Sequence, residues 1–170
     1  MPLPQRSIVL IGFMGAGKSA VGRELAQRLQ WPRHDTDEMV RAKLKMTIAE
    51  IFERQGEAAF RLAEAEVLRR IPSAPPNIVV TGGGVLLRDE NAALLALLGN
   101  RVWLDADEEL LWERASRRDS RPLLRQPNPR ENFSALFRNR QPVYRAAADH
   151  RVDITGQTIA EVATAVMKVL

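Results

Sequence analysis

A glycine-rich stretch near the amino terminus limits the possible folds more than any other feature. Residues 7–19 form an apolar run followed by Gly-Phe-Met-Gly-Ala-Gly-Lys-Ser, which matches the Gly-x-x-x-x-Gly-Lys-Ser pattern of phosphate-binding loops. Gly12, Gly15 and Gly17 can adopt positive φ, so that backbone N–H groups converge on an anion at the start of a helix. The stretch therefore predicts a buried strand, a phosphate-binding loop and a helix.

Two side chains in this loop add the chemistry that a nucleoside triphosphate needs. Lys18 supplies a positive charge for the β- and γ-phosphates, and the Ser19 hydroxyl is the expected ligand of Mg²⁺. Apolar residues then recur at helical spacing over 21–29. The residues expected to contact ATP here are Gly15, Ala16, Gly17, Lys18, Ser19 and Ala20.

Length and charge set further limits. A chain of 170 residues suits one α/β domain over 1–170, and the absence of cysteine excludes disulfides and thiolate metal sites. The net charge of +4 could indicate nucleic acid, but basic residues are mixed with acidic ones and aromatics are only 5%. We expect anionic small-molecule substrates, no nucleic acid, no membrane and no targeting segment, and a cytoplasmic monomer.

Residues 33–37 predict a second strand that ends in two carboxylates. Arg33 and His34 suit a buried strand poorly, so we expect a short strand near an edge of the sheet. A ligand role for His34 is less favoured than a surface position. Asp37 has two interpretations: it caps a helix over 38–44, or it faces the crevice where open α/β sheets bind ligands.

A helical insert over about 36–70 is predicted next. The capping box Thr47-Ile-Ala-Glu50 starts one helix, which Gly56 is expected to end, and an apolar stripe from Phe60 predicts a second helix that Pro72 stops. Two helices in succession between strands form an insert that could close over a substrate.

Two later segments each allow two interpretations. Thr-Gly-Gly-Gly at 81–84, after the short apolar strand 78–80, is a flexible loop or a place where the backbone approaches a ligand. The Arg- and Pro-rich residues 117–129 form a solvated surface or an arginine-bearing lid over phosphates.

The remaining pattern completes a regular order. It predicts helices over 89–98 and 108–116, the latter capped by Asp107, and a strand over 102–104 between them. A helix from Phe133 is expected to end or kink at Pro142, before a last strand over 151–154. A second capping box opens a terminal helix, which should bury Ile159, Val162, Ala163 and Val166. This order predicts a five-stranded parallel sheet with helices on both faces.

The ordered motifs resemble those of the shikimate kinases, from Ile8 to about Val166. Besides the phosphate-binding loop, they are Val-Gly-Arg at 21–23, Asp-Thr-Asp at 35–37, Ile-Ala-Glu-Ile-Phe at 48–52, Gly-Glu at 56–57, Phe-Arg at 60–61, Thr-Gly-Gly-Gly at 81–84, Arg-Pro-Leu-Leu at 121–124 and Arg-Gln-Pro-Val-Tyr at 140–144. The resemblance implies a P-loop kinase fold, similar to that of nucleoside monophosphate kinases, and phosphorylation of the 3-hydroxyl of shikimate in aromatic amino-acid biosynthesis.

The resemblance also implies the residues that hold the acceptor. Asp37 would contact the reacting hydroxyl, while Arg61 and Arg140 would bind the substrate carboxylate. Gly83 would approach the substrate ring. A carboxylate on the substrate would give both arginines a binding partner, because the guanidinium group can pair with this planar anion through two hydrogen bonds.

At the nucleotide end, the resemblance places Arg121 on the ATP phosphates, with Arg118 and Gln157 beside the adenine. Asp35 would assist Mg²⁺ through water. Since phosphoryl transfer depends on positioning and charge neutralisation, Lys18, Arg121 and Mg²⁺ should carry most of the catalysis.

Two rival functions remain at this point. Another kinase of the same fold could act on gluconate or a nucleotide, because Arg61 and Arg140 would serve any anionic acceptor. A nucleotide-binding switch without metabolite chemistry is the other rival. The presence of Asp37, of the lid arginine Arg121 and of the acceptor-binding pair Arg61 and Arg140 argues against it.

Overall fold

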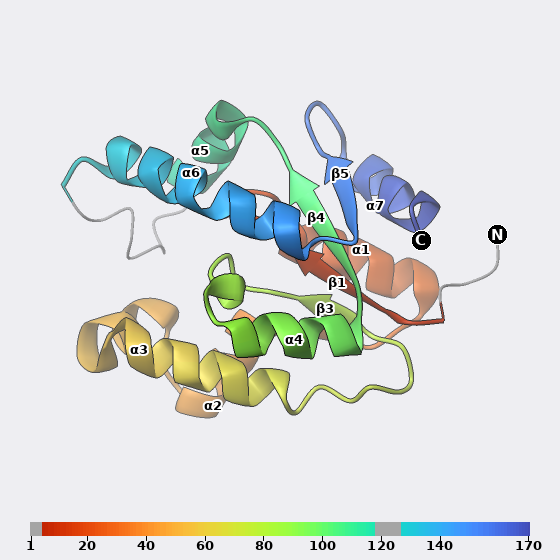
Figure 1. Cartoon of the computed structure of the whole chain (residues 1–170), viewed down its shortest axis with the longest axis horizontal. Helices are drawn as coiled ribbons and strands as arrows, with labels where there is room; N and C mark the ends of the chain where they lie inside the picture. Colours follow the sequence, from red (N-terminus) through yellow and green to blue (C-terminus); the bar gives the residue numbers. More distant parts are fainter. Residues whose placement is uncertain (1–4, 118–126) are drawn as a thin grey trace.

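A five-stranded, all-parallel sheet in the order β2-β3-β1-β4-β5 organises the protein. The structure is a computed structural model that describes residues 5–117 and 127–170. The strands are β1 (Ser7–Ile11), β2 (Arg33–Asp35), β3 (Ile78–Val80), β4 (Gly99–Asp105) and β5 (His150–Asp153). The helices are α1 (Lys18–Leu29), α2 (Thr36–Leu44), α3 (Ile48–Leu68), the 3-10 turn η1 (Val85–Leu87), α4 (Asp89–Leu98), α5 (Glu108–Ser116), α6 (Pro129–Ala147) and α7 (Ile159–Lys168) (Figure 1).

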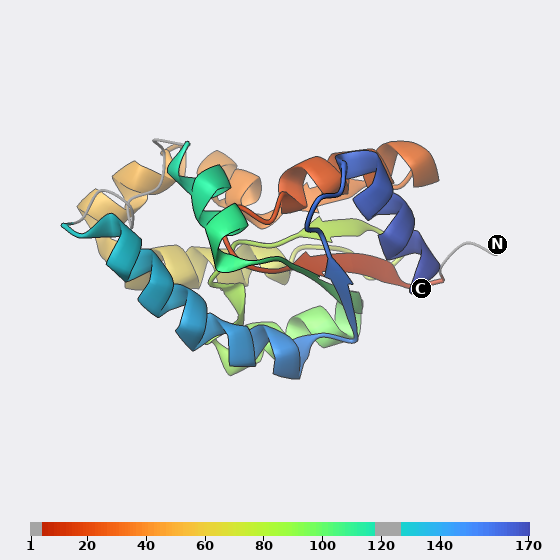
Figure 2. The same ribbon diagram turned by 90° about the horizontal axis from the view of Figure 1, so that it is seen from above.

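The core surrounds the central strand β1. All five of its residues are buried, and Leu10 pairs with Val80 of β3 on one side and Val102 of β4 on the other. Parallel strands are buried on both faces, which explains the unbroken apolar run. Helices α1 and α7 cover one face of the sheet and α4 and α6 the other (Figure 2). The sheet and its covering on both faces, predicted from the sequence, are confirmed.

The weak second strand is also confirmed. β2 has only three residues and lies at an edge of the sheet. His34 Nε2 lies 3.1 Å from Oδ1 of Asn77, whose amide nitrogen donates to the carbonyls of Pro72 and Pro75. His34 thus helps to fix the loop before β3, which is a structural role.

Most helix limits follow from capping. Both predicted capping boxes form: the Thr47 hydroxyl accepts from the Glu50 backbone N–H at 3.2 Å, and Glu50 accepts from the Thr47 N–H at 2.8 Å. Thr158 and Glu161 make the same pair of contacts at the start of α7. Gly56 has φ 82° and ψ 169°, outside the helical region, so the first helical segment of α3 ends there, as predicted, and a second segment follows within the same element. Helices α2 and α3 lie between β2 and β3, over the residues of the predicted insert.

Three expectations about single residues are wrong. Pro142 does not end α6, since the helix continues through it to Ala147. Asp107 occupies the N-cap position of α5 but makes no side-chain cap. Ile159 shares a face with Val162 but is 49% exposed, since the first turn of α7 extends beyond the core. Within the described residues, no helix is long and apolar enough to cross a bilayer.

Candidate active site

One cavity of about 630 Å³ opens at the carboxyl end of the sheet. Its walls come from the β1–α1 loop, the β3–η1 loop and helices α2, α3, α5 and α6. Helices α2, α3 and α5 lie beyond the strand ends on that side (Figure 2). The predicted residues that line it are Gly15, Gly17, Lys18, Ser19, Ala20, Asp37, Arg61, Gly83 and Arg140.

The β1–α1 loop has the geometry of an anion-binding turn. Gly12, Gly15 and Gly17 have φ of 143°, 87° and 77°, as the sequence predicts. A Cβ at Gly12 would lie 2.6 Å from the carbonyl oxygen of Leu104, and one at Gly15 would overlap that of Leu111. Ala16, also predicted to contact ATP, is buried within the loop. Only glycine allows the loop to pack this closely on β4 and α5.

The buried Lys18 side chain is held across this loop. Its Nζ donates to the carbonyl of Gly12 at 2.7 Å and to that of Phe13 at 3.0 Å. The first turn of α1 contains no acidic residue, so its positive dipole end is not neutralised by a neighbouring carboxylate. The ammonium and the helix terminus therefore attract an anion to the same side of the sheet.

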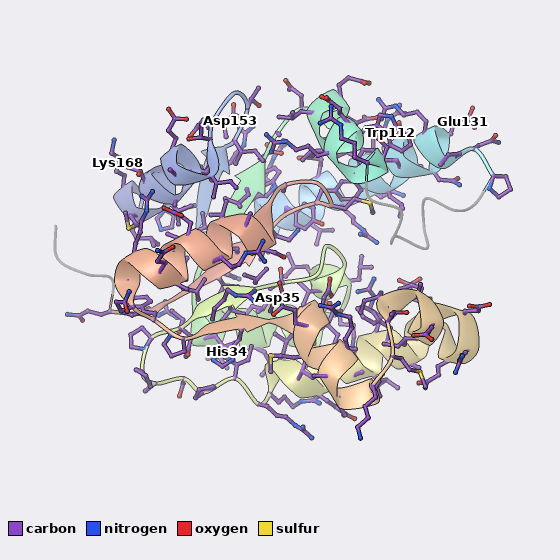
Figure 3. The ribbon with its side chains drawn as sticks, turned by 180° about the vertical axis from the view of Figure 1, so that it is seen from behind. His34, Asp35, Trp112, Glu131, Asp153 and Lys168 are labelled. Carbon is purple, nitrogen blue, oxygen red and sulfur yellow. The ribbon has the colours of Figure 1, made fainter. Side chains whose placement is uncertain are left out.

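Asp35 connects the loop to the edge of the sheet. The Ser19 hydroxyl donates to Oδ2 of Asp35 at 2.9 Å, and Oδ1 of Asp35 accepts from the backbone N–H of Asp37 at 3.1 Å and that of Glu38 at 3.4 Å. Asp35 is thus the N-cap of α2. The alternative that Asp37 caps this helix is wrong, because the helix begins one residue before Asp37. Figure 3 shows Asp35 where the chain enters α2.

The pair of Ser19 and Asp35 fits a hard cation such as Mg²⁺ better than a metal that prefers sulfur or imidazole ligands. Both offer oxygen, which Mg²⁺ prefers, and Mg²⁺ in phosphoryl-transfer sites uses few protein ligands and completes its shell with water and phosphate. Over residues 5–117 and 127–170 no group of three or more His, Cys, Asp or Glu side chains could hold a metal ion. An ion held jointly with a nucleotide suits this arrangement.

The acceptor end of the cavity is built around the glycines of the β3–η1 loop. A Cβ at Gly82 would lie 2.8 Å from Oδ1 of Asp37 and 2.8 Å from Oε1 of Glu64, and one at Gly84 would overlap the guanidinium of Arg61. A side chain at either glycine would therefore require these neighbouring side chains to move. That the loop approaches a bound ligand stays a prediction. The approaching groups in this structure are side chains of the protein.

The two predicted arginines meet at this loop. Arg61 lies against Gly84, while Arg140 donates to the carbonyl of Gly83 at 3.2 Å. The hydroxyl of Tyr144 donates to the same carbonyl. Burial raises the pKa of Tyr144 to about 12, so the phenol remains a neutral donor at physiological pH. Helices α3 and α6 thus bring Arg61 and Arg140 to adjacent residues of this loop.

A buried carboxyl lies beneath Arg61. Oε2 of Glu64 accepts from Nη1 of Arg61 at 2.9 Å, whereas Oε1 has no hydrogen-bond partner among the described residues. Burial is the main cause that raises the pKa of Glu64, and the negative charge of Asp37 raises it further. The positive charges of Arg61 and Arg140 oppose this shift but do not cancel it. Burial also disfavours the charged Arg61, but Glu64 and Glu57 outweigh it and raise its pKa.

Several groups at this site have no role assigned from the sequence, and Tyr144 is noted there only as the last residue of the motif at 140–144. Glu64 and Tyr144 support the acceptor end, and Arg114 of α5 lines the cavity. A charged residue next to buried apolar positions of a helix would have been the signal for two of these groups. Glu64 lies between Ala63 and Val67 on α3, and Arg114 precedes Ala115 on α5.

Some predicted residues are not brought to the cavity. Gln157 lies in the β5–α7 loop, where its Nε2 donates to the carbonyl of Asp153 at 2.5 Å, and it does not line the cavity. Arg118 and Arg121 fall outside the described residues, because residues 118–126 of the predicted lid (117–129) are not described. Their roles stay predictions.

The sheet order, the phosphate-binding loop after the central strand and the helical insert facing it define a P-loop kinase that acts on a small molecule. A family model described as "Shikimate kinase" matches residues 14–170. The chain belongs to the shikimate kinase family. It is therefore an ATP-dependent kinase of the shikimate pathway.

Individual relatives agree over nearly the whole chain. A shikimate kinase of Cereibacter sphaeroides is 43% identical, covering 98% of this chain and 83% of that protein, and one of Symbiobacterium thermophilum is 42% identical, covering 96% and 95%. The structure of shikimate kinase from Acinetobacter baumannii in complex with shikimate superposes with a TM-score of 0.92 at 35% identity, covering 98% and 92%. The resemblance and the fold predicted from the sequence are confirmed.

Proposed function

We propose that the protein transfers the γ-phosphoryl group of ATP to the 3-hydroxyl of shikimate and uses Mg²⁺. One observation carries this proposal: a single cavity joins the phosphate-binding loop, a carboxylate at the start of α2 and two arginines from α3 and α6. Such a cavity can hold a triphosphate and an anionic alcohol side by side. The similar Acinetobacter baumannii protein, solved with shikimate, supports the choice of acceptor.

At the nucleotide end, the backbone of residues 15–20 surrounds the phosphates. Lys18 exchanges its two carbonyl contacts for phosphate oxygens, and this exchange brings its charge to the group that moves. Ser19 is the proposed protein ligand of Mg²⁺, with Asp35 orienting the Ser19 hydroxyl and reaching the ion through water. When bound, Mg²⁺ neutralises charge on the phosphates.

At the acceptor end, Asp37 orients the 3-hydroxyl and accepts its proton. Arg61 and Arg140 bind the carboxylate of shikimate, and Gly83 lies against the ring. Both arginines are nearly enclosed, with Arg61 12% and Arg140 6% exposed, and a charge-assisted hydrogen bond is strong in such a place. From the resemblance we retain Arg121 for the phosphates and Arg118 and Gln157 for the adenine.

An ADP-release assay tests this function directly. Shikimate, gluconate and nucleoside monophosphates are offered at equal concentrations, and we expect MgATP turnover with shikimate alone. The product should carry a phosphate at its 3-position, which two-dimensional ¹H–³¹P NMR detects. Turnover of gluconate at a comparable kcat/KM would instead establish the rival kinase activity, and ATP binding with no acceptor turnover would indicate a switch.

A further inference from the structure

The guanidinium of Arg61 already donates hydrogen bonds to two carboxylates of its own helix, α3. Oε1 of Glu57 accepts from Nε at 3.3 Å and from Nη2 at 3.0 Å, and Oε2 of Glu64 accepts from Nη1 at 2.9 Å. The backbone of Gly84 closes one side of the group, and the Phe60 ring centroid lies 5.0 Å from Cζ. The paired Nε and Nη2 donors form the edge that a planar carboxylate prefers.

The two carboxylates differ in how readily they can leave. The Glu64 side chain is 0% exposed, so breaking its bond would leave a charge without water or partner. The Glu57 side chain is 51% exposed and lies four residues before Arg61 on a helix surface. It can turn into water by changing its rotamer, and exposed pairs of this spacing contribute little.

We propose that Glu57 is a built-in competitor for the substrate carboxylate. It occupies the Nε and Nη2 edge of Arg61 in the empty enzyme, the carboxylate of shikimate replaces it there, and Glu64 keeps Nη1 throughout. This inference rests on the proposed role of Arg61 in binding that carboxylate. Glu57 then keeps a nearly enclosed guanidinium paired in the absence of substrate, and it lowers the affinity for shikimate.

The charge-neutral variant Glu57→Gln tests the exchange by isothermal titration calorimetry of shikimate. Because an exposed pair at this spacing is weak, the dissociation constant should fall about two- to fivefold. A shikimate analogue with a primary amide in place of the carboxylate should bind wild type and variant equally. Equal binding of this analogue by wild type and Glu57→Gln distinguishes competition for Arg61 from a general change in the fold.

A matched control comes from α1, where Glu24 pairs at the same i, i+4 spacing with Arg28, which, unlike Arg61, does not line the cavity. Glu24→Gln should leave shikimate binding unchanged, and thermal melts of both variants record any loss of stability. If Glu57→Gln alters the fold, Glu57→Ser provides a second test, and the dissociation constant of shikimate should fall in the same way.

Unchanged or weaker shikimate binding by folded Glu57→Gln would overturn the inference, because it would mean that Glu57 stays on Arg61 when the substrate binds. The variant Arg61→Ala separates this failure from that of the proposed function. If Arg61→Ala weakens shikimate binding while Glu57→Gln has no effect, only the exchange is wrong. If Arg61→Ala has no effect, Arg61 does not bind the carboxylate and both are wrong.

Discussion

The Ser19 hydroxyl donates a 2.9 Å hydrogen bond to Asp35, which joins the phosphate-binding loop to the edge strand of the sheet. Strand β3 lies between the two strands that carry these residues into place. The same Asp35 carboxylate caps α2, the helix that carries Asp37. One side chain thus fixes the proposed metal ligand and the proposed acceptor carboxylate relative to each other.

Substitutions of Asp35 should separate its two roles. Asparagine caps helices as well as aspartate does, so Asp35→Asn should keep the melting temperature close to that of the wild type. The loss of charge should raise the Mg²⁺ concentration for half-maximal activity, which a MgCl₂ titration at fixed ATP measures. Asp35→Ala should show the same shift and lose about 1 kcal/mol of stability with the cap. An unaltered Mg²⁺ dependence in both variants would contradict a role near the metal.

Asp37 is expected to act in chemistry and not in capping. Because Asp35 is the cap, Asp37→Asn should leave the melting temperature nearly unchanged and reduce kcat on the order of 10²-fold, the contribution of a positioned base. Glu38→Gln, on the next residue of the same turn, controls for the loss of a negative charge. Steady-state kinetics with saturating shikimate measures the effect. A kcat near that of wild type would exclude Asp37 as the proton acceptor.

Arg61 and Arg140 should be coupled through one substrate group. If each makes a charged hydrogen bond to the carboxylate, each alanine variant should lose roughly 1.5–3 kcal/mol of binding, or about 10- to 100-fold in the shikimate dissociation constant. The double variant should lose less than the sum. Calorimetry of a full cycle gives the coupling, and ATP binding without shikimate is the internal control. Strict additivity would mean that the two arginines bind different groups.

Tyr144→Phe tests the support of the glycine loop. The substitution removes the donor to the Gly83 carbonyl but keeps the ring that packs beside Trp103. A typical hydrogen bond of about 1 kcal/mol predicts an increase of about fivefold in KM for shikimate. KM for ATP should be unchanged. Since the phenol has a pKa of about 12, the ratio of variant to wild type should be constant from pH 6 to 9. A loss of stability with an unchanged shikimate KM would leave Tyr144 a packing role only.

The parts of this site that the sequence predicts are those set by adjacent residues. The phosphate-binding loop is one continuous motif, and its glycines adopt the expected positive φ. The Asp-Thr-Asp element was ambiguous because Asp37 could cap a helix or face the crevice. The hydrogen bonds that Asp35 accepts from the backbone N–H groups of Asp37 and Glu38 make Asp35 the cap. The two carboxylates on Arg61 lie at i, i+4 and i, i+3 spacing on α3, so helical spacing was an available signal for both pairs. The contact of the Tyr144 phenol with the Gly83 carbonyl depends on how α6 meets the β3–η1 loop, and helical spacing alone could not show it.

The buried carboxyl of Glu64 should make stability depend on pH in a defined direction. Burial, followed by the charge of Asp37, raises its folded pKa above the ordinary value of 4.5, so its ionisation costs more in the folded than in the unfolded protein. This cost lowers the free energy of unfolding above the folded pKa and disappears as the pH falls below 4.5. The variant Glu64→Gln has no such titration. Wild type should therefore gain stability relative to Glu64→Gln on acidification, and urea unfolding from pH 7.5 to 4.5 measures the difference. Glu53→Gln, at an exposed position of the same helix, controls for net charge. If the difference in unfolding free energy between wild type and Glu64→Gln stays constant or declines on acidification, the folded pKa of Glu64 is not raised. The pair with Arg61 would then offset the effect of burial.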